Sequence, residues 1–187
     1  YRSDNFSFLS FDVEESPSFY LTYEGKKQDI PKKIESTDEL PNCRVNAYGV
    51  MQIGEMLTNI GCLRDLNLDM NPNAQENFHL LCQPAGKQVL LFLSLRHCEI
   101  TDDGVKKIAN ELQYQDPPNE PRLISLSLSN NHITCIGAGH VGSMLRTNRS
   151  LKSLSLLGNR IRDEGASLII KELKMYGKLL KLNGHVI

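Results

Sequence analysis

Several side chains could do catalytic chemistry, but their spacing keeps them apart. His97 and Cys98, followed by Asp102 and Asp103, have the residue types of a Cys–His nucleophile system. We expect Cys98 to point into a buried core and His97 to point elsewhere, so that thiol and base would not meet. No i,i+4 pair of metal ligands is present among the other histidines, His79, His132, His140 and His185. The sequence therefore predicts no catalytic centre and no metal site, and we expect a protein that is not an enzyme.

Residues 137–142, Gly-Ala-Gly-His-Val-Gly, formally match the G-x-G-x-x-G dinucleotide fingerprint. In that fingerprint the glycines directly follow a strand, and an acidic residue about 20 positions later binds a ribose hydroxyl. Here the run lies about eight residues beyond the predicted strand at Leu128 instead of directly after it. Gly137 and Gly142 also fit the repeat described below. We therefore expect no nucleotide and no other cofactor.

Composition narrows the class of protein further. The 187 residues are 40% hydrophobic, enough for a sizeable core, and the net charge of -1 gives no basic excess for non-specific nucleic-acid binding. The longest apolar run, residues 89–95, is far too short to span a membrane. Five cysteines without a C-x-x-C pair favour a reduced, cytoplasmic setting. The two N-x-[ST] sequons, at Asn5 and Asn148, lack any secretory context.

A repeat of about 28 residues organises most of the chain. The pattern L-x-x-L-x-L-x-x-(N/C) begins at Leu63, Leu90, Leu123 and Leu151. Behind the last three copies, apolar residues recur at helical spacing. A weakened copy precedes them and a truncated copy follows, so that repeat starts fall near 35, 63, 90, 123, 151 and 179. The sequence predicts an α/β solenoid of about five strand–helix repeats plus a truncated one, with a parallel sheet on the concave face.

The ladder position of the repeat carries Asn71, Asn131 and Asn159. We expect these amides to satisfy turn backbone groups from the inside, one repeat after another. Cys43 and Cys98 take that place in their copies and are interpreted as small buried structural thiols.

Three further features depend on this register. Glycines stand at equal places in the helical series, at positions 104, 137 and 165, where we expect them to allow close packing. Residues 113–121 contain three prolines and predict a loop insertion, with the preceding helix ending at about Tyr114. Thr101 stands where a helix cap is wanted.

The amino-terminal segment, residues 1–34, does not fit the repeat. It holds seven of the twelve aromatic residues, and Phe19–Tyr23 alternates partly like a strand. We expect it to cap the open end of the array at 35–187, because terminal repeats need their core covered. An arm or strand that binds a partner is the alternative.

At these residues the sequence resembles the ribonuclease-inhibitor-like class of leucine-rich repeats. Within that class it is similar to the family of leucine-rich repeat-containing protein 71, through the stretch Leu93–Gly104, the long spacer before Leu123 and the bridge Leu145–Leu151. The resemblance implies a scaffold component of motile cilia, located in the axoneme and packed among other axonemal proteins.

Recognition is expected on one of two surfaces. The open face of the strands carries small polar residues, among them Ser127 and Ser155, together with Phe92. Charge is divided unevenly: residues 1–120 hold 11 basic and 19 acidic groups, whereas residues 121–187 hold 10 basic and 3 acidic groups. We expect recognition to depend more on this second, basic half, because its field is cooperative. Its candidate binding residues are Arg146, Arg149, Lys152, Arg160, Arg162, Lys171, Lys174, Lys178 and Lys181.

Together these observations predict a protein-interaction scaffold with protein partners and no nucleic-acid or membrane partner. The basic half would suit an acidic partner such as tubulin or an axonemal scaffold subunit. The alternative function is that of a cytosolic regulator or inhibitor of one soluble enzyme.

Overall fold

The computed structural model describes residues 20–23, 26–29, 37–59, 61–74, 77–83, 89–114, 120–175, 181–182 and 185–186. The chain forms two compact units, Tyr1–Glu35 and Ser36–Ile187. In the first unit, β1 (Tyr20–Tyr23) pairs antiparallel with β2 (Lys26–Asp29), so the strand predicted there is present. The other aromatic residues of the segment lie outside the described residues, and the capping role stays a prediction.

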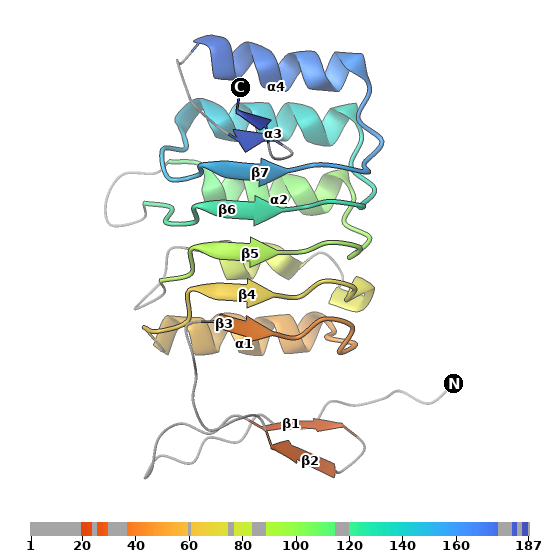
Figure 1. Ribbon diagram of the computed structural model, residues 1–187, viewed down its shortest axis with the longest axis vertical. Helices are drawn as coiled ribbons and strands as arrows, with labels where there is room; N and C mark the ends of the chain where they lie inside the picture. Colours follow the sequence, from red (N-terminus) through yellow and green to blue (C-terminus); the bar gives the residue numbers. More distant parts are fainter. Residues whose placement is uncertain are drawn as a thin grey trace. The chain divides into compact units, whose positions relative to one another are not determined.

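In the second unit, seven short strands follow one another in chain order across a single sheet (Figure 1). They are β3 (Thr37–Glu39), β4 (Asp65–Asn67), β5 (Phe92–Ser94), β6 (Ser125–Ser127), β7 (Ser153–Ser155), β8 (Lys181–Leu182) and β9 (His185–Val186). Strands β3 to β8 pair in parallel. The central leucines of four neighbouring strands are in register and buried, namely Leu66, Leu93, Leu126 and Leu154. One residue of each strand therefore faces the core and its two neighbours face outward.

Four α-helices form the layer behind the sheet (Figure 1). They are α1 (Ala47–Asn59), α2 (Asp102–Leu112), α3 (Cys135–Thr147) and α4 (Asp163–Met175). The helical series predicted from sequence is the buried face: in α2 it comprises Gly104, Val105, Ile108, Ala109 and Leu112. Burying each larger apolar side chain contributes about 1.5–3 kcal/mol. Helix α2 ends two residues before the predicted Tyr114.

The second repeat departs from the strand–helix pattern. In place of an α-helix it has two 3₁₀ helices, η1 (Pro72–Ala74) and η2 (Asn77–Cys82). Phe78, Leu81 and Cys82 still fill the helix side of the core. Pro84 follows shortly after in the sequence, and a proline cannot continue a helix because it lacks the N–H.

The asparagine ladder is confirmed. The side chain of Asn131, 3% exposed, accepts hydrogen bonds from the backbone N–H groups of Cys98 and Ile100 at 3.0 and 3.1 Å. Its Nδ2 donates to the carbonyl oxygens of Leu95, Leu128 and Ser129. Asn71 and Asn159 likewise bond both their own turn and the preceding repeat. Each amide therefore joins two repeats; Asn71 and Asn131 are buried, whereas Asn159 is half-buried.

At the same position in the third repeat, Cys98 makes a weaker hydrogen bond between repeats than the asparagine amide does. Its Sγ is buried and donates to the Leu68 carbonyl of the preceding repeat at 3.3 Å. A thiol is a weak donor and a weak acceptor, so it cannot reproduce the amide's bonds. The residue after the cysteine, Glu99, has a left-handed φ of 57°, as does Arg44 after Cys43 with 53°. The two cysteine copies therefore share a turn geometry of their own.

After the ladder asparagines the chain adds a further bond between repeats. The backbone N–H of His132, which follows Asn131, donates to the Ile100 carbonyl at 2.9 Å. Arg160, which follows Asn159, donates in the same way to the Ile133 carbonyl at 2.8 Å. These bonds tie the third, fourth and fifth repeats together.

The sheet closes on itself after the fifth repeat. Leu182 in β8 is in register with Leu154, as a sixth copy of the repeat requires, whereas Leu179 lies outside the described residues. Strand β9 then pairs antiparallel with β8. The outer edge of β8 is therefore occupied by the chain itself.

Candidate functional site

The outward residues of the strands form two aligned columns. One contains Asp65, Phe92, Ser125 and Ser153, and the other contains Asn67, Ser94, Ser127 and Ser155. Both columns had been expected from the repeat register. Phe92 is 42% exposed and is the one aromatic residue in them. We call these columns the open sheet face.

Hydroxyl groups on the open sheet face bond to one another and to neighbouring turns. Ser129, which sequence analysis did not single out, lies 2.7 Å from the Ser155 hydroxyl and 3.4 Å from the Ser127 hydroxyl. Ser94 donates to Asp69 at 2.7 Å, and that carboxylate also accepts from the Arg96 backbone. These contacts hold the hydroxyl groups of the open sheet face in place. A partner that hydrogen-bonds to these hydroxyl groups would have to compete with the existing contacts.

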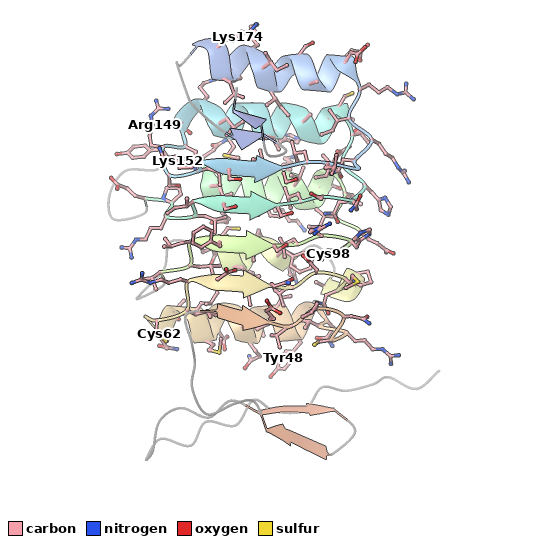
Figure 2. All side chains as sticks on the ribbon, in the orientation of Figure 1. Tyr48, Cys62, Cys98, Arg149, Lys152 and Lys174 are labelled. Atoms are coloured by element: carbon pink, nitrogen blue, oxygen red, sulfur yellow. The ribbon has the colours of Figure 1, made fainter. Side chains whose placement is uncertain are left out.

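The predicted basic residues divide between the two edges of the array. Arg146, Arg149, Lys152 and Lys174 lie where helices end and strands begin, which we call the helix-end edge; Figure 2 shows the last three on this side. Arg160 and Arg162 lie between β7 and α4, on the opposite, strand-end edge. Lys171 is exposed on α4, Lys178 lies outside the described residues, and Lys181 is in β8. The structure therefore does not gather all nine candidates into one patch.

Contacts connect the helix-end edge from one repeat to the next. Arg146 at the end of α3 makes a bidentate ion pair with Glu172 of α4, with bonds of 3.0 and 3.1 Å. This guanidinium holds the pKa of the Glu172 carboxyl below its usual value. Arg149 donates to the Arg146 carbonyl, and Lys152 donates to the Arg149 carbonyl. Both cations thereby lie at the carbonyl end of α3, which carries partial negative charge.

Asn148 fixes the position of this edge. The residue is fully buried, its Nδ2 donates to the Leu112 carbonyl at the end of α2, and its Oδ1 accepts from Leu151 N–H. A buried amide with these bonds is not an acceptor for glycosylation, so the sequon at Asn148 is structural. The sequence signal for this role is an asparagine immediately after the helical series.

The strand-end edge has a carboxylate, Asp102, that connects two neighbouring repeats. Asp102 accepts from the backbone N–H groups of Thr134 and Gly137 and from the Thr134 hydroxyl, so it caps α3 in the next repeat. Burial raises the pKa of Asp102, but these hydrogen bonds and His140 outweigh that effect and lower it. Thr101 is the N-cap residue of α2, yet its side chain makes no capping hydrogen bond.

The Cys98 thiol and the glycine run at 137–142 have structural roles. Burial raises the pKa of the Cys98 thiol to about 11, and the neighbouring His97 is exposed with a φ of 53°. The glycine run at 137–142 lies inside α3, where Gly137 adjoins Asp102, Ile133 and Val105. The described part of the chain holds no group of three His, Cys, Asp or Glu residues that would bind a metal ion. None of the helices in that part is long and apolar enough to cross a membrane.

Comparisons with known proteins agree with this architecture. A family model described as Leucine Rich repeat matches residues 86–109 and 147–169. NACHT, LRR and PYD domains-containing protein 13 of Homo sapiens is 27% identical over 170 residues, which are 77% of this chain and 16% of that protein. NACHT, LRR and PYD domains-containing protein 4E of Mus musculus is 27% identical over 128 residues, 67% of this chain and 13% of that protein. The chain thus spans a small part of these relatives.

A solved structure titled Leiomodin-1 Actin-Binding Site 2 (ABS2) aligns with a TM-score of 0.48 and 19% identity, covering 80% of this chain and 70% of that one. The narrower resemblance to the family of leucine-rich repeat-containing protein 71 receives no support from these matches. The repeat register, the parallel sheet with its helix layer and the matched repeats show that the chain folds as an α/β solenoid of leucine-rich repeats.

Proposed function

We propose that the chain is a non-enzymatic scaffold for protein–protein interaction. The observation that carries this proposal is the stack of parallel strands with one face covered by helices and the other lined by the open sheet face. Such an array presents a broad, rigid surface rather than a closed pocket. Leucine-rich repeat proteins generally serve as interaction scaffolds, which is consistent with this use of the fold.

Cross-linking mass spectrometry on the full-length protein in its own cells tests the proposal. We expect reproducible cross-links from residues of the array to a small set of proteins. As a control, the same protein without the array unit, Ser36–Ile187, should lose them. A wild-type array that cross-links to nothing above this control would contradict the proposal.

The narrower proposal is that this scaffold belongs to the axoneme of motile cilia, with tubulin or other axonemal subunits as partners. It depends on the resemblance carried by Leu93–Gly104, the long spacer before Leu123 and Leu145–Leu151. A scaffold of this kind should sediment with axonemes and resist salt washing. A regulator of one soluble enzyme, the second candidate, should instead copurify with that enzyme in a fixed ratio.

A further inference from the structure

From the geometry we propose that the helix-end edge of the fourth and fifth repeats docks an acidic segment of a partner protein. The surface consists of Arg149, Lys152 and Lys174, with Tyr114 beside the end of α3. This inference depends on the proposed scaffold function and specifies which surface is used and what chemistry it recognises.

Charge distinguishes this edge from the opposite one. Arg146 is already paired with Glu172, whereas Arg149, Lys152 and Lys174 form no ion pair with any acid that the structure describes. All three are exposed. On the strand-end edge, Arg160 and Arg162 directly precede Asp163 and Glu164 in the first turn of α4, and these acids offset their charge. On the helix-end edge the acids Glu111 and Glu120 belong to the third repeat, so the three unpaired cations of the fourth and fifth repeats keep a net positive field there.

The connections between these residues make the edge one continuous surface. Lys152 bonds to Arg149, Arg149 bonds to Arg146, and Arg146 pairs with Glu172, two residues before Lys174. Because backbone carbonyls and Asn148 hold this chain of contacts, the cations sit on a rigid base. A partner that binds here would lose little additional freedom in the surface itself.

Tyr114 gives the surface an anchor that is not charged. Its side chain is 42% exposed, and its backbone N–H donates to the Thr147 hydroxyl at the last residue of α3. Tyrosine and arginine are the residue types most enriched where interfaces gain their binding energy. An exposed tyrosine of the third repeat, on the same edge as three cations, is therefore suited to a segment that alternates acidic and apolar residues.

Overall charge favours a protein partner over a nucleic acid. Residues 1–120 carry 11 basic and 19 acidic groups, and the whole chain has a net charge of -1. A long polyphosphate would be repelled by this acidic half, since it extends over many repeats. A short acidic segment would contact the basic edge alone.

The test measures binding of a fluorescein-labelled synthetic peptide of alternating glutamate and leucine, by fluorescence anisotropy, at low and physiological salt. The edge variant is Arg149→Glu with Lys152→Glu and Lys174→Glu. The matched control variant is Lys106→Glu with Arg160→Glu and Arg162→Glu, which changes the net charge equally at other exposed sites. Circular dichroism confirms that both variants are folded.

We expect the edge variant to bind at least about tenfold more weakly and the control variant to change by less than about threefold. Tyr114→Ala, which keeps the charge, should also weaken binding by about threefold or more. Equal weakening by both charge variants would mean that net charge alone matters and would overturn the proposal. Unchanged binding by the edge variant or by Tyr114→Ala would overturn it as well, as would tighter, edge-dependent binding of single-stranded poly(dT).

Cross-linking in cells separates this inference from the scaffold function. If the wild-type array and the edge variant capture the same partners equally, the docking edge is wrong and the scaffold function stands. If the wild-type array captures none, the scaffold function itself is wrong, whatever the peptide shows. Loss of the partners from the edge variant alone supports both.

Discussion

Among single residues, the buried amide of Asn131 has the most partners. It bonds two backbone N–H groups of the preceding repeat and three carbonyl oxygens. Removing one partner from a buried polar group leaves the other with its full cost of desolvation. This position therefore gives the sharpest test of the ladder.

Asn131→Ala should lower the free energy of unfolding by about 3 kcal/mol, because several buried backbone groups lose their partner. Asn159→Ala is the matched comparison, since Asn159 is only half-buried and makes three such bonds. We expect it to cost about half as much. Urea denaturation of both variants measures the difference, and equal losses would show that burial does not decide the cost.

The Cys98 thiol makes stability depend on alkaline pH. Its pKa in the folded chain is about 11, above the ordinary value of a cysteine thiol, because burial disfavours the thiolate. Unfolding is therefore linked to ionisation, and the stabilising effect is complete below pH 9 and is lost as the pH rises toward 11. At pH 10.5 the loss attributable to Cys98 should be about 2 kcal/mol. Denaturation of wild type and Cys98→Ser at pH 8 and 10.5 measures it: the variant should lose less stability, and parallel losses would contradict the linkage.

At the scale of elements, the helices lie close enough for single glycines to matter. A Cβ at Gly165 would lie 2.9 Å from the Cys135 Cα in the neighbouring helix and 3.1 Å from the Ala138 Cβ. At Gly139 a Cβ would meet only the end of the Leu168 side chain, at 3.6 Å. The two positions thus form a pair in which one substitution clashes and the other has room.

Gly165→Val should lower the melting temperature by several degrees, since overpacking costs about 1–3 kcal/mol or more. Gly139→Ala should raise it slightly, because alanine favours a helix by about 1 kcal/mol relative to glycine. Differential scanning fluorimetry checks both. Unchanged stability in Gly165→Val with lost partner binding would make Gly165 a binding residue instead.

Local patterns predicted the elements well where periodicity was complete. The repeat pattern predicted that the leucines of each strand and the apolar series of α2, α3 and α4 face the core. It also predicted the ladder role of Asn71, Asn131 and Asn159. The 3₁₀ helices at 72–74 and 77–82 were not predicted. Phe78 and Leu81 keep a helical spacing, and the nearby prolines limit the length of the helix without specifying its type. The role of Asp102 toward α3 was not predicted either, since it depends on how two repeats stack.

At the scale of the whole molecule, the basic residues could be counted from the sequence, but their division between the helix-end edge and the strand-end edge could not be predicted from it. That division depends on whether a residue follows a helix or follows a strand. Arg149 and Arg160 are close in sequence, yet they lie at opposite ends of β7. The net charge of residues 121–187 therefore overstates the charge that any one partner would meet.

Deletion of residues 1–34 tests the proposed cap. If this segment covers the first repeat, its removal should lower the melting temperature by several degrees and promote association at high concentration. Thermal denaturation and analytical ultracentrifugation of the deleted and complete chains provide the measurement. A deleted chain that stays monomeric and equally stable would favour a partner-binding arm.

The Cys98 thiol, which stands where other repeats have the ladder asparagine, also determines how the array would respond to mechanical load. Repeats in a stack that is pulled from its two ends act as springs in series, so extension begins where the contacts between layers are weakest. We expect that place to be the junction of the second and third repeats, because a weak S–H···O contact replaces the amide there and the helix layer is a short 3₁₀ segment, although Ser94 and the Arg96 N–H also bond to Asp69 across it. We expect optical-tweezers traces to show the first rip as release of the first two repeats, and Asn131→Ala should move it toward the next junction. A scaffold under tension in its assembly would thus yield at one defined layer while the three repeats behind it stay folded.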